Sequence, residues 1–372
     1  MTAPHKEPEF IKKNICFVNT SKNWGGGEKW HFVAATICAE DANCTVITHP
    51  NSSLENKLKT KNNISIFNTK ISNASFLNPL TIFKLYRHFK KNNYQSVILN
   101  LPADAKCAGL AAKLAKVPKI IYRRGMPHPI RNTFLNRIVF GKIITDVIVN
   151  SDEIGRSITK NNPRIINKDQ IHTIYNGVEI ESYSPKDYSL EEHKSKVILG
   201  TAGRCVNQKN QLMLMDLVKD LKDKGYNIEL YIAGTGPLES KIKEKIITLG
   251  LEQQIKLLGF VEDTPSLLST LDIYVFPSHY EGSANALVEA MATAIPSVTY
   301  NVSSMPEMVK HNQTGKLANY EDPTDFLNQV EALIKDRELR VKLGHNARKL
   351  AESKFNNKVI FTKIKQHIGV NR

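Results

Sequence analysis

Short, almost continuously apolar segments alternate with longer amphipathic ones along the whole chain, and this alternation restricts the possible folds. Apolar runs of this kind are typical of strands that helices cover on both faces. In the first half we expect strands at residues 15–20, 44–49, 64–68, 96–101, 119–123, 146–150 and 171–175. Between them, the patterns at residues 80–91, 103–115 and 132–144 predict helices.

The same rhythm restarts after a polar stretch, residues 183–193, which is the best candidate for a linker. The strands expected beyond it are residues 197–202, 228–233, 255–258, 272–276 and 297–300. Strand–helix alternation predicts parallel sheets in α/β domains. The predicted fold is therefore two doubly wound, Rossmann-like domains that face each other across a cleft.

The length of 372 residues fits two domains, which we place at residues 1–183 and 194–355. A last helical pattern, residues 356–368, could pack on either. The polar start of the chain lacks the apolar core of a signal peptide, and no apolar run reaches the ~18–20 residues that span a bilayer. We therefore expect a soluble or peripheral protein.

Charge and cysteine content restrict the partners and the compartment. The formal net charge is +15, most of it in the first half, which implies an anionic partner or simply a solvated, lysine-rich surface. The five cysteines form no CxxC pair and indicate buried thiols in a reducing compartment, so a zinc site is not expected.

Ligands of open α/β sheets bind beyond the carboxyl ends of the strands, so the strand-to-helix turns are where we expect a site. Gly25, Gly26 and Gly27 follow the first strand and allow close approach of an anion to a helix N-terminus, although a merely tight turn is the alternative. In the second half, Gly203 precedes Arg204 and Lys209. This pair, with a helix N-terminus, predicts a diphosphate cradle.

A further polar constellation follows the strand at residues 272–276. Glu281, the amides of Gly282 and Ser283, and Glu289 suit recognition of the hydroxyls of a sugar or a ribose better than a general acid–base pair. Taken alone, Glu289 is better explained as a residue that complements a helix dipole. Gly234-Thr-Gly236-Pro237 is a weaker signal that a plain turn also explains.

Together these segments resemble the retaining GT-B glycosyltransferases of glycosyltransferase family 4. The resemblance rests on Gly203-Arg204 with Lys209, Tyr175-Asn176-Gly177-Val178, Gly234-Thr-Gly236-Pro237, Gly259-Phe-Val, and above all Glu281-Gly282 followed by Glu289-Ala-Met-Ala. It is thinner in the first half, where Gly25-Gly26-Gly27-Glu28 is similar to the family's glycine-rich loop.

The resemblance implies a role for each matching residue. Arg204 and Lys209 would hold the diphosphate of a nucleotide sugar, and Gly26 and Gly27 would close on it from the opposite domain. The sugar hydroxyls would be held by Glu281, Gly282, Ser283 and Asn285, and the ribose by Glu289. Gly203 and Gly234 would shape the donor pocket. It also implies that the last segment, residues 356–372, packs back on the first domain.

Two departures from the family pattern, together with the absence of a metal-binding motif, bear on the expected site. The usual His after the fourth strand is missing, and Asp104 and His128 are two open candidates to replace it. Ser303-Ser304 stands where the family has two glycines, so Glu307 reads as part of a Ser304-x-x-Glu307 capping box. No Asp-x-Asp occurs, so neither a metal-bridged diphosphate nor any other cofactor is expected.

The expected activity is transfer of a hexose from a nucleoside-diphosphate sugar to a glycan or lipid-linked acceptor, in cell-surface polysaccharide or lipopolysaccharide synthesis at the cytoplasmic face of a membrane. The acceptor and anionic lipid would meet the basic first domain. The candidate residues there are Arg123, Arg124, His128, Lys90 and Lys91. A GT-B-type nucleotide-sugar epimerase is the alternative. A nucleic-acid-binding protein is disfavoured because basic and aromatic residues do not interleave.

Overall fold

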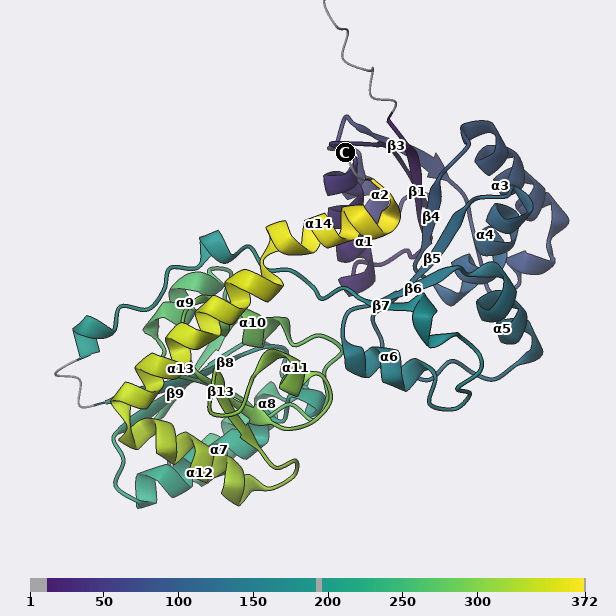
Figure 1. The fold of residues 1–372 in the computed structure, drawn as a ribbon. Helices are drawn as coiled ribbons and strands as arrows, with labels where there is room; N and C mark the ends of the chain where they lie inside the picture. The colour runs from purple at the N-terminus through teal and green to yellow at the C-terminus, as the bar shows by residue number, and fades with distance from the viewer. Residues whose placement is uncertain (1–11, 192–195, 371–372) are drawn as a thin grey trace, which may run out of the picture. The chain divides into compact units, whose positions relative to one another are not determined.

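A computed structural model describes residues 12–191 and 196–370 and divides the chain into two compact units (Figure 1). Of the described residues, the first unit holds those up to Asn150, Ile154–Ile174 and those from Phe361 onward. The second holds Ser151–Glu153 and Tyr175–Ile360. The polar start of the chain and residues 192–193 of the expected linker lie outside the described residues.

The first unit is built on a parallel sheet in the order β3-β2-β1-β4-β5-β6-β7. At its centre, Phe17 of β1 pairs with Val46 of β2 and Ile98 of β4. Its strands are β1 (Asn14–Asn19), β2 (Asn43–Thr48), β3 (Ile64–Asn68), β4 (Ser96–Leu99), β5 (Lys119–Arg124), β6 (Asp146–Val149) and β7 (Ile171–Thr173). Its helices are α1 (Gly26–Cys38), α2 (Ser53–Leu58), η1 (Ser75–Leu77), α3 (Pro79–Asn92), α4 (Pro102–Leu114), α5 (Phe134–Ile138), η2 (Val139–Ile143), α6 (Asp152–Ile158) and η3 (Lys168–Gln170). The first two residues of α6 are counted with the second unit.

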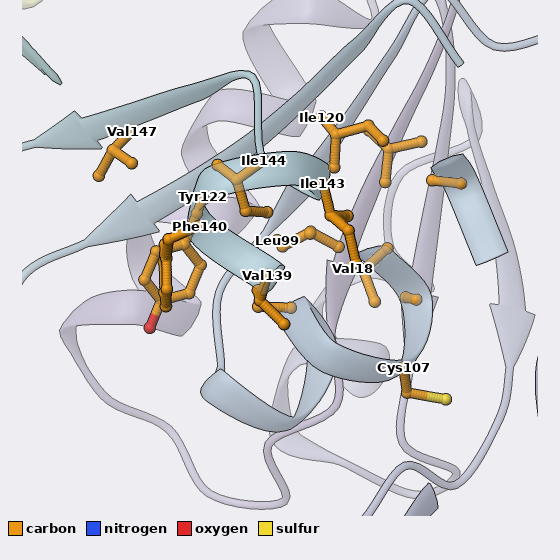
Figure 2. Close-up of a cluster of buried hydrophobic side chains, with 14 of the residues drawn as sticks. Val18, Leu99, Cys107, Ile120, Tyr122, Val139, Phe140, Ile143, Ile144 and Val147 are labelled. Atoms are coloured by element: carbon orange, nitrogen blue, oxygen red, sulfur yellow. The ribbon is translucent and has the colours of Figure 1, made fainter. Parts of the chain in front are cut away.

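The core of this unit forms because its strands are apolar on both faces. Figure 2 shows Leu99 of β4 and Ile120 of β5 beside Val139 and Ile143 of η2, all of them buried. The prediction of one regular helix at residues 132–144 is wrong in detail. The segment is a short α-helix capped by Thr133, followed by the π-helical turn η2, which directs Val139, Phe140 and Ile143 into the core.

The second unit repeats this design, with a parallel sheet in the order β10-β9-β8-β11-β12-β13. Its strands are β8 (Val197–Ala202), β9 (Ile228–Ala233), β10 (Ile255–Gly259), β11 (Ile273–Phe276), β12 (Ser297–Tyr300) and β13 (Gly315–Ala318). Its helices are η4 (Ile180–Ser182), η5 (Tyr188–Glu191), η6 (Asn207–Lys209), α7 (Gln211–Asp223), α8 (Glu239–Thr248), α9 (Thr264–Thr270), α10 (Asn285–Ala292), α11 (Met305–Met308), α12 (Pro323–Lys335), α13 (Arg337–Leu350), η7 (Ala351–Phe355) and the start of α14 (Asn357–Ile368). The prediction of two doubly wound Rossmann-like domains is confirmed.

The stretch expected to be a linker is instead packed onto the second unit. Lys186 is buried, and its Nζ forms an ion pair with Asp272 Oδ1 at 2.8 Å. Tyr188 donates a hydrogen bond from its hydroxyl to the Ala294 carbonyl at 2.8 Å. A buried charge of this kind needs a partner, so these described residues are fixed parts of the second unit.

The end of α14 lies against the first unit (Figure 1). Lys365 Nζ is 2.8 Å from both Glu40 Oε2 and Asp41 Oδ2, just after α1. The Ser96 hydroxyl donates to the Ile368 carbonyl at 2.6 Å, and Lys119 Nζ donates to the His367 carbonyl at 2.8 Å. These bonds satisfy carbonyls at the helix end that have no intrahelical partner.

Candidate active site

A pocket of about 670 Å³ opens at the carboxyl edge of the second unit's sheet. The loops after β8, β9 and β10 and the start of α10 line it. Strand order reverses around β8, whose neighbours are β9 and β11, and such a switch point is the usual ligand site of an open α/β sheet. Six of the residues expected to bind a donor line this one pocket: Gly203, Arg204, Lys209, Gly234, Asn285 and Glu289.

Two cations line this pocket, and they differ in their surroundings. Arg204 is exposed, directly after the turn that ends β8. Lys209 is half-buried, with Nζ 2.8 Å from Glu281 Oε1 and 4.7 Å from the centre of the Phe276 ring. A lysine held by a carboxylate and an aromatic face has few alternative positions. Lys209 is therefore held in position, beyond the carboxyl end of β8, before any ligand binds.

The glycines of the loop after β9 are required because two backbone segments meet there. A Cβ on Gly234, whose φ is +129°, would lie 2.0 Å from the Gly203 carbonyl oxygen. A Cβ on Gly236 would lie 2.4 Å from the Cys205 carbonyl oxygen. The segments also bond directly, since the Gly203 N–H donates to the Ala233 carbonyl at 2.9 Å. Gly234-Thr-Gly236-Pro237 thus forms the floor of the pocket by close contact with the loop after β8. A plain turn, the alternative considered from the sequence, would not require these two glycines.

Glu281 is anchored at both its backbone and its side chain. Its carboxylate holds Lys209, and its backbone carbonyl accepts a hydrogen bond from the Ser303 hydroxyl at 2.8 Å. Ser303 has a φ of +56°, a left-handed conformation in which glycine is favoured. This explains the glycine of the family pattern at that position. Glu281, Gly282 and Ser283 are not among the residues that line the pocket. Ser283 Oγ lies 2.9 Å from Asn285 Oδ1.

Glu289 lines the pocket from the second turn of α10. Four further lining residues were not assigned a role from the sequence. They are Phe260, Val261, Thr264 and Leu267, and Phe260 is 79% exposed. The tripeptide Gly259-Phe-Val was part of the family pattern, but nothing in the sequence showed that an exposed aromatic ring would border the pocket.

Asp104 is placed away from solvent, which argues against contact with a substrate. The carboxyl group is fully buried and binds the Thr20 hydroxyl at 2.5 Å and the Leu101 N–H at 3.2 Å. Burial raises the pKa of Asp104 to about 7, against the lowering effect of these hydrogen bonds. Asp104 therefore ties the end of β1 to the start of α4.

Gly26 and Gly27 begin α1 in the first unit. No described atom would lie within 4 Å of a Cβ on Gly26, so this glycine is open to a ligand. A Cβ on Gly27 would lie 2.7 Å from Asn100 Nδ2. Asn100 in turn donates to Glu28 Oε1 at 3.3 Å, so the loops after β1 and β4 are joined.

The residues expected to meet the acceptor are not gathered at one place. Arg123 is buried, over the ring of Trp30 at 5.7 Å, and its position argues against the predicted direct acceptor contact. Arg124 is half-buried and donates to the carbonyl of His128, which is exposed.

Lys90 and Lys91 end α3 beside Asn92, whose carbonyl accepts a hydrogen bond from Asn14, the first residue of β1. They therefore lie where the strands begin, opposite the edge at which the sheet's ligands are expected.

The expected capping box around Ser304 is wrong. The Ser304 side chain makes no cap of α11. The Glu307 carboxylate instead accepts hydrogen bonds from the N–H groups of Asp152 and Glu153, each at 2.8 Å. Backbone amides at the start of a helix favour a negative charge, so the Glu307 carboxylate stabilises the N-terminus of α6.

The chain matches known families over most of its length. Residues 185–350 match the model of glycosyl transferases group 1, and residues 32–182 match that of glycosyltransferase family 4. The capsular polysaccharide biosynthesis glycosyltransferase CapM of Staphylococcus aureus is 30% identical over 228 residues, which are 59% of this chain and 60% of the relative. The chain thus spans about three fifths of that relative's length.

Other relatives give the same picture. An Escherichia coli UDP-Gal:alpha-D-GlcNAc-diphosphoundecaprenol alpha-1,3-galactosyltransferase is 25% identical over 74% of this chain and 75% of its own. The solved structure of Anabaena Alr3699/HepE in complex with UDP and glucose has a TM-score of 0.74 at 19% identity, covering 96% of this chain and all of that one. The apo lipopolysaccharide outer core galactosyltransferase WaaB has a TM-score of 0.78 at 18% identity, covering 96% and 99%. With both family models matched in order on two Rossmann-like units, the chain belongs to the GT-B glycosyltransferases of family 4.

Proposed function

We propose that the chain transfers a hexosyl group from a nucleoside-diphosphate sugar to a glycan or lipid-linked acceptor, with retention at the anomeric carbon, in cell-surface polysaccharide or lipopolysaccharide synthesis. The observation that carries the proposal is the pocket of the second unit, where Arg204, Lys209 and Glu289 converge on a glycine-rich floor. Relatives named as glycosyltransferases of capsule and of undecaprenol-linked glycans, and relatives solved with UDP, support the same substrate class.

Each part of the pocket suits one part of such a donor. The planar guanidinium group of Arg204 can form bidentate hydrogen bonds with the diphosphate, and Lys209 adds a point charge. Glu289 would accept the ribose hydroxyls, while the exposed Phe260 offers a face on which a base can stack. Glu281, already bound to Lys209, would accept hydrogen bonds from the sugar hydroxyls.

The chemistry follows from where charge develops. As the anomeric C–O bond breaks, its electron pair passes to the leaving diphosphate, and Arg204 and Lys209 stabilise that charge more in the transition state than in the ground state. The acceptor hydroxyl forms the new bond on the same face, and its proton passes to an oxygen of the leaving phosphate. Because the leaving phosphate accepts this proton, the reaction needs no base from the protein, which is consistent with the burial of Asp104.

A thermal-shift panel of UDP-, GDP-, ADP- and CMP-linked sugars tests donor binding. One donor at ~100-fold above its dissociation constant should add about 2.7 kcal/mol of stability to the folded state. NMR of the product should then show the anomeric configuration of the donor. No response to any donor, or isomerised sugar from donor alone, would contradict transferase activity.

We also propose that α3 docks on an anionic membrane. No helix of the described residues combines the length and apolarity needed to cross one. Leu80 and Phe83, near the start of this helix, are 78% and 56% exposed, and Leu77 of the preceding turn η1 is 72% exposed. The exposed basic residues that continue this face are Lys84, Arg87, Lys90 and Lys91. Apolar side chains can enter the interface while each nearby cation adds about 1 kcal/mol against anionic lipid.

Sedimentation with vesicles of phosphatidylglycerol and phosphatidylethanolamine tests this surface. The wild-type protein should sediment at low salt, and a double variant, Leu80→Asp with Phe83→Asp, should not. Ile247→Asp is the matched control, because Ile247 is a 66% exposed apolar residue on α8 of the second unit. Equal sedimentation of the double variant and the wild type would argue against docking through α3.

A further inference from the structure

Three potential metal ligands meet in the first unit, on segments distant in sequence. Asp146 begins β6, His172 lies in β7, and His367 lies in the last turn of α14. One ligand atom from each lies within 4.8 Å of the other two. None of the three lines the pocket of the second unit.

The separations suit a small tetrahedral ion. Asp146 Oδ1 is 3.3 Å from His172 Nε2 and 3.8 Å from His367 Nε2. Zinc bonds of about 2.0–2.2 Å to nitrogen and oxygen place tetrahedral ligands roughly 3.3–3.5 Å apart. The ligand atoms of the two imidazoles lie within 4.8 Å of each other, so a movement of the rings would bring all three atoms around one ion.

The surrounding contacts orient the ligands. The Thr145 hydroxyl donates to Asp146 Oδ2 at 2.6 Å, which leaves Oδ1 facing both imidazoles. His367 Nε2 is buried and has no hydrogen-bond partner among the described residues. The nearby cation, Lys119, is engaged by the His367 carbonyl at 2.8 Å.

We propose that Asp146, His172 and His367 bind one divalent transition-metal ion such as Zn²⁺, with water completing the coordination. Two imidazoles and one carboxylate are borderline ligands that suit zinc rather than calcium or magnesium. The ion would join the C-terminal helix to β6 and β7. The ion would have a structural role. It would not contact the donor diphosphate, which is still expected to bind without a metal.

Metal titration of the full, tag-free chain after treatment with a chelator tests the site. We expect one equivalent of Zn²⁺ to bind and to raise the Tm by about 5–10 °C at 100-fold excess over its dissociation constant. Co²⁺ in its place should give the intense visible absorption of a tetrahedral site, and Mg²⁺ should give no shift.

Variants assign the binding to this cluster. Asp146→Asn and His367→Gln should weaken Zn²⁺ binding at least about tenfold, the effect expected even of an indirect partner. His345→Gln, an exposed histidine of the second unit, is the matched control and should bind as the wild type does. Should either variant fail to fold without metal, His172→Gln carries the test, because that side chain is 38% exposed.

Failure to bind one equivalent of Zn²⁺, or equal affinity in the wild type and the three cluster variants, would overturn the proposal and leave the cluster as a metal-free contact. Because the readout is metal binding and Tm, the outcome is independent of whether the chain is a glycosyltransferase.

Discussion

Lys209 illustrates how one side chain is prepared for an anion before any anion is present. Its ammonium group is held between the Glu281 carboxylate at 2.8 Å and the Phe276 ring at 4.7 Å. Glu281 therefore has two tasks: it positions Lys209 and, in our proposal, it receives the sugar hydroxyls. These tasks can be separated, because UDP carries the diphosphate without the sugar.

Glu281→Gln should therefore lower kcat by about 100-fold while changing the affinity for UDP less than tenfold, since the lost charge acts mainly on the reacting sugar. Steady-state kinetics and calorimetric UDP titration measure the two quantities. A variant that loses UDP binding but keeps kcat would show that Glu281 serves only Lys209.

Two buried titratable groups of the first unit predict opposite pH effects on stability. The pKa of Asp104 is raised to about 7 by burial, so the folded state keeps a proton that the unfolded chain releases, and stability falls as pH rises from about 4 to 7. The pKa of His31 is lowered to about 3 by burial and by Arg123, so stability falls as pH decreases below about 6.5. In the wild type these contributions offset each other.

Asp104→Asn removes one of them. Its free energy of unfolding, measured with urea between about pH 4.5 and 6.5, should rise with pH more steeply than that of the wild type, by up to about 1.4 kcal/mol per pH unit. His31→Gln should change the slope in the opposite direction. Parallel pH profiles for all three proteins would show that neither group is shifted.

At the residue level, the sequence predicted the donor pocket because its residues follow the ends of neighbouring strands, and strand ends meet at one edge of the sheet. Arg204, Lys209 and Glu289 come together for that reason. Burial could not be predicted in this way. Asp104 and Arg123 also follow or end strands, but long-range packing turns both into the interior.

At the scale of elements, the loops after β8 and β9 form one unit that depends on glycine. Gly236→Ala should destabilise the second unit by about 2–3 kcal/mol and weaken donor binding, because a Cβ would lie 2.4 Å from the Cys205 carbonyl oxygen and a backbone must move. Gly141→Ala is the control, since no described atom lies within 4 Å of its Cβ. Equal unfolding free energies for both variants would show that the loop tolerates the shift.

The same scale shows which elements the sequence reveals. Strands buried on both faces, such as β8 and β9, were predicted with their observed bounds because apolar runs mark them. The short edge strand β13 was missed, since Gly315 and Lys316 interrupt its apolar pattern. Gly315 is needed there because a Cβ would lie 2.6 Å from the Ser297 carbonyl oxygen of the paired strand β12.

For the whole molecule, repeated strand–helix alternation was enough to predict two Rossmann-like units. It could not predict that residues 184–188 pack on the second unit, because the buried pair of Lys186 and Asp272 joins positions far apart in sequence. For the same reason, the cluster of Asp146, His172 and His367 appears only in three dimensions.

In our proposal, Arg204 and Lys209 stabilise the negative charge that develops on the departing diphosphate. Turnover of the responding donor by Arg204→Ala, Lys209→Ala and the double variant tests it most directly. Lys219→Ala is the control, a lysine paired with Asp223 on the surface of α7. Each single change should raise the barrier by about 3–4 kcal/mol, or 10²–10³ in kcat, and the control should turn over as the wild type does. Unchanged kcat in the double variant would contradict the claim.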